Sequence, residues 1–195
     1  MMNQRQRDKA DTRQRIIDAG LELFRAHGYD NTSMSQIAQA AATSRANLYL
    51  HFSSKPLVVK ARMSQLQPQV IKHFRKLQDL PDHAPATLRL WLLEDRQIYR
   101  EHRAEFQAIT AAFATDDEVY REWTGMHARI IAEQRWIEET VPDPGEREVR
   151  KAQFTTLLLT TERTFDIIYL RGDDAFDEDT LLTALARQWA ALFAA

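Results

Sequence analysis

Apolar residues recur at helical spacing along this 195-residue chain, and that spacing limits what the chain can fold into. The clearest example lies near the N-terminus, where one buried helix face is predicted to consist of Ile16, Ala19, Gly20, Leu23 and Phe24. Alternating β-branched and aromatic residues, which are typical of strands, are missing, and the chain has only 5 Gly and 6 Pro. The sequence therefore predicts an all-α fold.

Capping residues and helix breakers divide the rest of the chain. The first helix should end at Gly28, because glycine readily adopts the positive φ that often follows a helix. Pro68 should limit the helix after residue 62, and Gly172 should end a long helix. Later helices are expected over residues 86–101, 103–113, 116–141, 146–170 and from 177 onward. Since no repeat or flexible linker is evident, we expect two rigidly joined domains, residues 1–60 and 61–195.

Composition argues against several function classes. The chain has no Cys, so disulfides and thiolate metal sites are not available. The 6 His form no i, i+4 pair or H-E-x-x-H pattern, and neither a Gly-rich phosphate loop nor a G-x-S-x-G elbow occurs. The N-terminus is polar, and no apolar run is long enough to span a membrane. We therefore expect a cytoplasmic protein that is not an enzyme and uses no metal, cofactor or membrane.

Charge is distributed unevenly along the chain. The formal net charge is −2, but no acidic residue occurs between Asp30 and Asp79. The basic residues of this segment are Arg45, Lys55, Lys60, Arg62, Lys72, Arg75 and Lys76. Because a local basic surface attracts a polyanion even on a mildly acidic protein, this segment is expected to meet nucleic acid.

Two short helices are predicted within that segment. Ser33 and Gln36 match a capping box at the start of the first, and Ser44 can cap a second over residues 45–51. The residues expected to face inward are Met34, Ile37, Ala38 and Ala41 in the first helix and Leu48 and Phe52 around the second. Two short helices separated by a tight turn are typical of a helix-turn-helix, here predicted at residues 33–52.

The second short helix carries the candidate DNA contacts. Its early residues Arg45, Ala46 and Asn47 are predicted to touch base edges, because arginine pairs with guanine, asparagine pairs with adenine and alanine allows close approach. Phosphate contacts are predicted for Thr32, Ser33, Ser44, Tyr49, His51 and Lys55. Leu50 has two possible roles, contact with DNA methyl or sugar groups or packing on a neighbouring helix.

A longer pattern runs from about residue 10 to residue 60. It comprises Ile16-Ile17-Asp18-Ala19, Leu23-Phe24, Gly28-Tyr29, Thr32-Ser33, Ile37-Ala38, Leu48-Tyr49, His51-Phe52 and Ser54-Lys55. In order and spacing these residues resemble the signature of the TetR family of transcriptional regulators. Ala42 and Ala46 depart from it, because the family usually has Gly in the turn and again early in the recognition helix. Those alanines are expected to affect the turn geometry and the sequence preference.

The resemblance implies a dimeric, ligand-responsive repressor. A three-helix helix-turn-helix domain would read double-stranded operator DNA, and a larger helical domain would hold a small apolar effector and dimerise. The last two helices, residues 146–171 and 177–194, would form the homodimer interface. Helical spacing consistent with that interface is seen at Leu157, Leu158, Thr161, Phe165, Ile168, Leu181, Leu185, Trp189 and Leu192.

A second resemblance rests on fewer residues of the C-terminal half. Val119-Tyr120-Arg121-Glu122-Trp123, Glu162-Arg163-Thr164-Phe165 and Trp189 are similar to the branch that contains the mycobacterial repressor of ethionamide activation. In that branch the ligand lies in an apolar tunnel. The resemblance implies that a similar tunnel in this chain is lined by Trp91, Phe106, Phe113, Trp123, Met126, Ile130, Phe154, Leu158, Thr161 and Phe165. The alternative for each is ordinary core. Glu162-Arg163 could anchor a ligand, form an internal ion pair or contact a partner subunit.

The alternatives to a regulator are an enzyme and a helical adaptor. An enzyme would need one of the motifs that are missing. A helical adaptor would bind protein through the same exposed helices. The acid-free segment and the two capped short helices favour DNA over a protein partner. The sequence does not distinguish repression from activation.

Overall fold

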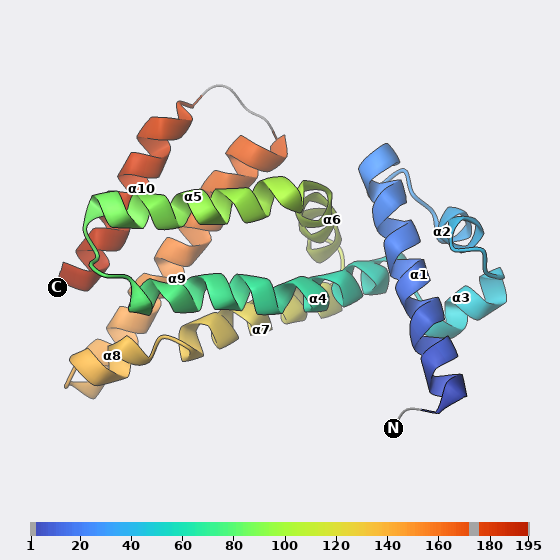
Figure 1. Cartoon of the computed structure of the whole chain (residues 1–195), viewed down its shortest axis with the longest axis horizontal. Helices are drawn as coiled ribbons and strands as arrows, with labels where there is room; N and C mark the ends of the chain where they lie inside the picture. The colour runs from blue at the N-terminus through green and yellow to red at the C-terminus, as the bar shows by residue number, and fades with distance from the viewer. Residues whose placement is uncertain (1–2, 172–175, 195) are drawn as a thin grey trace. The chain divides into compact units, whose positions relative to one another are not determined.

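The structure is a computed structural model that describes residues 3–171 and 176–194. Every regular element in those ranges is helical, which confirms the all-α prediction (Figure 1). In chain order the elements are α1 (Gln4–His27), α2 (Met34–Ala40), α3 (Arg45–His51), α4 (Lys55–Arg75), the 3-10 turn η1 (Lys76–Asp79), α5 (Pro85–Glu101), α6 (Arg103–Phe113), α7 (Asp117–Ala132), α8 (Arg135–Thr140), α9 (Pro144–Phe165), the π-helical turn η2 (Asp166–Arg171) and α10 (Glu178–Ala194). None of the helices in the described ranges is both long and apolar enough to cross a membrane.

The chain divides into two compact units. The head unit comprises the described residues up to Gln67 together with Ala104–Thr124, and the body unit comprises Pro68–Arg103 and the described residues from Gly125 onward. The division falls inside α4 and α7, so both helices contribute to each unit. The functional division at residue 60 stays a prediction. The compact head unit extends beyond that residue and takes in most of α6 and the first half of α7.

One apolar core holds the head unit together. Its buried side chains come from α1, α2, α4, α6 and α7 and from the recognition helix region, and include Ile16, Ile37, Leu48, Phe52, Val58, Ile109 and Val119. The inward orientation predicted for Leu48 and Phe52 is therefore confirmed. Gly20 allows α1 and α4 to pack closely, because a Cβ added there would lie 3.1 Å from Cγ1 of Val58.

Local caps set the bounds of α2 and α3. The amide of Gln36 donates to Oγ of Ser33 at 3.3 Å, and the amide of Ser33 donates to Oε1 of Gln36 at 2.8 Å. The capping box predicted at Ser33 is confirmed. The amide of Asn47 donates to Oγ of Ser44 at 3.1 Å, so α3 begins at Arg45 as predicted. These bonds satisfy amide groups that have no partner within a helix.

Two positive φ angles shape the head unit. Gly28 ends α1 with a φ of +82°, as the sequence predicted. Ala42, in the turn between α2 and α3, has a φ of +48°. An alanine in the left-handed region is strained, because its Cβ crowds the following carbonyl. Ala42 thus adopts the backbone conformation that a glycine would take without strain.

Helices α5, α9 and α10 form the core of the body unit, and α10 packs on both of the others (Figure 1). Their contact is largely aromatic. The ring centroid of Trp189 lies 5.3 Å from that of Trp91 and 5.1 Å from that of Phe154. All three side chains are buried. Large aromatic rings from three helices therefore fix how these helices pack.

Several helix ends differ from the predicted ones. Pro68 does not limit a helix but lies inside α4, on its exposed side. The single helix expected over residues 116–141 is two helices, because Gln134 has a ψ of 70° and interrupts the path between α7 and α8. The side-chain amide of Gln134 donates to the carbonyl of Ile130 at 3.1 Å, which ties the break to α7. Gly172 lies outside the described residues.

Candidate functional site

The recognition helix α3 presents a row of exposed side chains. Arg45 and Ala46 are exposed in its first turn, Tyr49 is 48% exposed and Leu50 is 80% exposed. Ala46 and Leu50 lie on the side of α3 opposite the buried Leu48, whereas Arg45, three residues before Leu48, projects from the first turn nearer to the side of Leu48. An apolar side chain with this exposure does not pack on a neighbouring helix, so that alternative for Leu50 is wrong.

Asn47 adjoins these exposed residues, but a hydrogen bond within the chain holds its side chain in place. It is half-buried, and its Nδ2 donates to Oγ1 of Thr43 at 2.8 Å. An asparagine amide has a second N–H and a carbonyl, so this bond uses only part of its hydrogen-bonding capacity. The structure therefore places Asn47 at the edge of the exposed face with its orientation already fixed.

The two hydroxyls that precede α2 have different environments. Thr32 is only 3% exposed, and its Oγ1 donates to the carbonyl of Gly28 at 2.9 Å. Ser33 is exposed, and its hydroxyl also donates to Oε1 of Gln36 at 2.7 Å. The structure brings Ser33 and the exposed Ser44 to the surface but not Thr32.

Lys55 makes a specific contact at the start of α4. Its Nζ donates to the backbone carbonyl of Tyr29 at 2.7 Å and lies 4.0 Å from the centroid of the Tyr29 ring. Partial burial lowers the pKa of Lys55, and burial raises the pKa of Tyr29 to about 12 with a further contribution from Asp116 and Asp30. Lys55 thus joins the start of α4 to the residues that follow α1.

His51 lies at the end of α3, next to basic residues that sequence reasoning missed. Burial lowers the pKa of His51, and the positive charges of Lys9 and Arg13 lower it further. The lowered pKa favours the neutral imidazole near pH 7, and its buried Nδ1 has no hydrogen-bond partner within the described residues. The guanidinium of Arg13 also lies 4.5 Å from the centroid of the Phe52 ring. The signal that could have revealed this neighbourhood is the four-residue spacing of basic residues early in α1.

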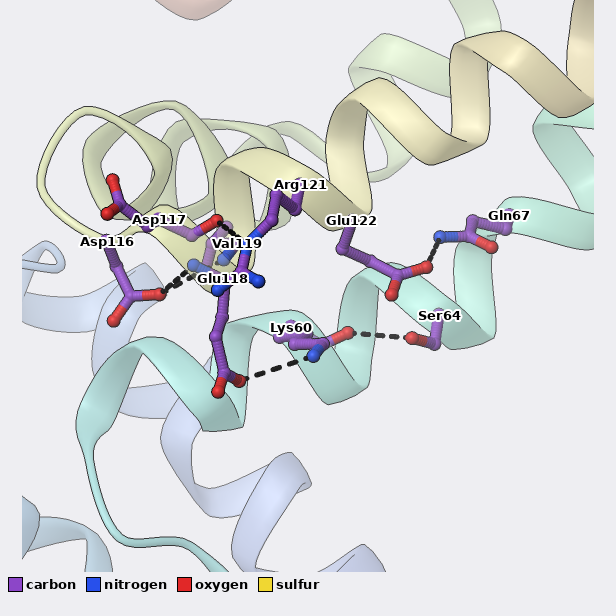
Figure 2. Close-up of polar contacts among 9 residues, drawn as sticks. All are labelled: Lys60, Ser64, Gln67, Asp116, Asp117, Glu118, Val119, Arg121 and Glu122. Carbon is purple, nitrogen blue, oxygen red and sulfur yellow. Dashed lines mark hydrogen bonds and ion pairs between the residues drawn. The ribbon is translucent and has the colours of Figure 1, made fainter.

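Polar contacts join α4 to α7 within the head unit (Figure 2). Nζ of Lys60 lies 3.3 Å from Oε2 of Glu118, and Nε2 of Gln67 donates to Oε1 of Glu122 at 2.7 Å. Asp116 caps α7, since its Oδ1 accepts from two backbone amides at 3.0 Å each. The start of α7 is thereby held against the helix that follows the recognition helix.

An ion pair joins α4 to α6 in the same unit. Nη2 of Arg62 lies 3.3 Å from Oε1 of Glu105, and the Glu105 side chain is only 5% exposed. Partial exclusion of water strengthens such a pair and makes the loss of either partner unfavourable. Together with the contacts of α7, it gives α4 polar links to two helices outside the helix-turn-helix.

The candidate effector residues fall in both units. Phe106, Phe113 and Trp123 are half-buried in the head unit, where the rings of Phe113 and Trp123 stack at 5.3 Å. The candidates buried in the body unit are Trp91, Met126, Ile130, Phe154, Leu158, Thr161 and Phe165. Oγ1 of Thr161 accepts a hydrogen bond from Nε1 of Trp189 at 3.0 Å. Thr161 is therefore already satisfied by a side chain of this chain.

Glu162 and Arg163 form internal contacts. Nε2 of His127 lies 2.9 Å from Oε1 of Glu162, and Nη1 of Arg163 donates to Oδ2 of Asp166 at 2.7 Å. These distances support the ion-pair alternative for Glu162-Arg163.

Two titratable groups are buried beside each other in the body unit. Nε2 of His73 lies 3.8 Å from Oδ1 of Asp95, which is beyond hydrogen-bond distance. Burial raises the pKa of Asp95 to about 8, with a further contribution from Glu162, and burial lowers the pKa of His73 to about 4. Desolvation disfavours the charged form of each group, so both are neutral near pH 7.

The stripe assigned to the dimer interface lies mostly in the core. Leu158, Thr161, Phe165, Leu185, Trp189 and Leu192 are buried within a single chain, so their assignment to the interface is wrong. The outer face of α9 instead carries an open depression lined by Thr156, Leu159, Thr160, Arg163, Thr164 and Ile167. Periodicity identified an apolar stripe, but the core of the same chain covers it.

Comparison with known proteins first concerns the helix-turn-helix region. Residues 16–61 match the family described as Bacterial regulatory proteins, tetR family. The HTH-type transcriptional regulator UidR of Escherichia coli (strain K12) is 36% identical over 76 residues, which are 39% of this chain and 39% of that protein. SrpR of Pseudomonas putida is 44% identical over 57 residues, 29% of this chain and 27% of that one. The chain thus spans less than half the length of the curated relatives it matches.

Solved structures match almost the whole chain. Salmonella enterica GusR has a TM-score of 0.64 at 24% identity and covers 94% of this chain and 96% of its own. Thermus thermophilus FadR, described as a TetR-family repressor in complex with lauroyl-CoA, has a TM-score of 0.61 at 20% identity and covers 93% and 91%. At these identities the likeness shows a shared fold. The match of residues 16–61 to the tetR family and the fold shared with these structures agree.

Proposed function

We propose that this protein is a ligand-responsive transcriptional regulator, a repressor that binds operator DNA as a homodimer and is released by a small apolar molecule. The observation that carries the proposal is the exposed face of α3. Arg45, Ala46, Tyr49 and the 80% exposed Leu50 stand on a short capped helix. The chain around it has no acidic residue between Asp30 and Asp79. Such a face fits the major groove of a polyanionic duplex.

Each residue of this face has a proposed role. Arg45 would bind guanine and Asn47 adenine, while Ala46 allows the helix to approach and Leu50 touches a thymine methyl or a sugar. Phosphates would be held by Ser33, Ser44, Tyr49, His51 and Lys55, and the buried Thr32 would act by fixing the loop before α2. Operator DNA lies in the cytoplasm, which is the location we propose.

The effector is proposed to be a small, mostly apolar molecule held by the half-buried aromatic candidates of the head unit, Phe106, Phe113 and Trp123. Among proteins of this fold, Thermus thermophilus FadR is described in complex with lauroyl-CoA, whose acyl chain is apolar. Phe106 and Phe113 of α6 and Trp123 of α7 pack against the core of the head unit. A ligand that shifts these side chains would therefore reach α4 through contacts that exist within one unit.

The homodimer is proposed to form through the outer faces of α9 and α10. On α9 this face includes Leu159, which is 40% exposed, and the depression around it. On α10 one exposed face carries small or polar residues: Thr180, Ala184, Arg187, Gln188 and Ala191. Small side chains allow helices of two subunits to approach closely in an isologous interface. Two recognition helices would then read half-sites roughly 35 Å apart.

Selection from a pool of random duplexes by the full-length protein tests DNA binding. The expected product is a pseudo-palindrome whose half-sites are about one helical turn apart. Enrichment of no sequence over an unrelated duplex would contradict the proposal and would revive a protein-binding adaptor.

The effector is tested on the duplex so selected. Native mass spectrometry of purified protein would first identify a retained small molecule. Its affinity for the protein should then fall when the duplex is present, by the same factor as the molecule weakens DNA binding, because the two equilibria are linked. Equal DNA affinities with and without the molecule would contradict release of the protein by an effector, but not the proposal that the protein binds DNA.

A further inference from the structure

Helix α1 extends well beyond the core of the head unit. Its first fully buried residues are Ile16 and Ile17, so residues 4–15 form an extension of about three turns, roughly 18 Å long. A helix that packs on nothing is only marginally stable in water. This one is held by local bonds and by α4: Asn3 and Gln6 form a capping box, and Nε2 of Gln65 donates to Oε1 of Gln14 at 2.7 Å. The extension is therefore a defined part of the protein surface.

Three basic residues line one side of the extension. Arg5, Lys9 and Arg13 are exposed and lie four residues apart, which places them in one stripe along the helix. Arg13 precedes the buried Ile16 and Ile17 by three and four residues, so the stripe continues the face of α1 that enters the core. Like charges at this spacing repel each other and destabilise a helix. An anion beside the stripe would relieve this repulsion.

No acidic side chain within the described ranges pairs with Arg5 or Lys9. The nearest acidic residue in sequence, Asp8, instead accepts a hydrogen bond from Nε2 of Gln4 at 2.8 Å. The charges of the stripe are thus available to a partner from outside the chain.

The stripe adjoins the recognition helix. The guanidinium of Arg13 lies 4.5 Å from the centroid of Phe52, the residue that follows α3. The charges of Lys9 and Arg13 are close enough to His51, in the last turn of α3, to lower its pKa. The basic stripe of α1 therefore lies next to the C-terminal end of α3.

We propose that Arg5, Lys9 and Arg13 form an additional DNA contact, which holds backbone phosphates of the same duplex whose major groove receives α3. The inference rests on the proposed function and extends the contact surface to a helix outside the helix-turn-helix. Long, exposed cationic side chains on a helix that lies beside the groove-reading element bind phosphate without reading sequence. The stripe adds affinity, and α3 supplies specificity.

The salt dependence of binding tests this contact. The probe is the duplex that the wild-type, full-length protein selects from a random pool, with a scrambled duplex of equal length beside it. Removing both charges with Arg5→Ala and Lys9→Ala should flatten the plot of log affinity against log salt. The expected change in slope is about 0.9 for each phosphate that the protein no longer neutralises, or up to roughly 3.6 for a dimer. Affinity for the two duplexes should fall by similar factors. Lys9→Arg alone should keep the wild-type slope.

The matched control removes the same charge from other faces of the same extension, with Arg7→Ala and Arg15→Ala. A slope change in the control as large as that in the stripe variant would overturn the proposal, as would an unchanged slope in the stripe variant. Arg13 is left in place because its contact with Phe52 supports the fold. Circular dichroism checks that both variants keep their helix content. If the wild-type protein selects no duplex at all, the proposed function fails and this inference with it.

Discussion

The ammonium group of Lys55 donates a hydrogen bond to the backbone carbonyl of Tyr29 at 2.7 Å while lying 4.0 Å from the centroid of the same residue's ring. The Lys55 ammonium therefore makes both a hydrogen bond and a cation–π contact to Tyr29. Lys55 was predicted to hold a DNA phosphate, a role that stays a proposal. The structure adds a second role, which is to fix the start of α4 against the chain that follows α1.

Lys55→Met should lower the free energy of unfolding by about 1–2 kcal/mol, because it removes both contacts but keeps the apolar stem. Lys60→Met is the control, since Lys60 pairs with Glu118 at a more exposed site and should lose less than about 1 kcal/mol. Urea denaturation measures both. Equal losses would mean that the Tyr29 contact contributes nothing beyond a surface pair.

Ala42→Gly should stabilise the protein by about 0.5–1 kcal/mol. It relieves the strain of an alanine at a φ of +48°, and part of the gain is offset by the greater backbone entropy of glycine in the unfolded chain. Ala46→Gly is the matched comparison, because Ala46 lies inside α3 and should lose about 1 kcal/mol. A lower urea midpoint for Ala42→Gly would show that the turn is not strained.

Arg45→Ala should weaken binding to the selected duplex by about 1–3 kcal/mol and relax the preference at one base pair of each half-site, because it removes a bidentate contact with guanine. Fluorescence anisotropy against duplexes with single base-pair changes measures both effects. Arg25→Ala removes the same charge from the last turn of α1, where Arg25 pairs with Glu22, and should change neither. An unchanged sequence preference in Arg45→Ala would remove this residue from base reading.

The buried pair in the body unit predicts how stability depends on pH. Folding raises the pKa of Asp95 from 3.8 to about 8, so the folded state retains a proton that the unfolded state releases, and stability falls as pH rises through this range. Folding lowers the pKa of His73 from 6.5 to about 4, so stability is lost as pH falls from about 6.5 to 4. The two effects oppose each other below pH 6.5, and only the first acts above it.

Stability should therefore fall by about 2 kcal/mol between pH 6.5 and pH 8. Urea denaturation at the two pH values measures the change. Asp95→Asn cannot ionise and should flatten the dependence over this range. A wild-type protein that is equally stable at both values would show that Asp95 is not held in its neutral form.

Leu159→Glu combined with Ile167→Glu should convert a dimer into a monomer in sedimentation velocity, because it places charge on the outer face of α9 and of the η2 turn that follows it. Leu90→Glu is the control. Leu90 is 64% exposed on α5, so a charge there should not change the oligomeric state. Dissociation in the control, or a dimer that survives both glutamates, would contradict the proposed interface.

The sequence by itself determined the features that depend on neighbours a few residues away. The Ser33 capping box, the Ser44 cap, the end of α1 at Gly28 and the inward faces of α2 and α3 all follow from contacts between residues three or four apart. Such contacts form in nearly the same way in any surrounding structure. The two helices α2 and α3 could therefore be located from the sequence.

Only the tertiary structure decided which surfaces are covered. Helical spacing marked an apolar stripe on α9 and α10 but could not tell a subunit interface from the chain's own core, because both bury the same residue types. It likewise could not foresee that α6 joins the core of the head unit, or that Thr32, in the loop before α2, is buried. Contacts between residues far apart in sequence set these outcomes, and no local pattern encodes the partner.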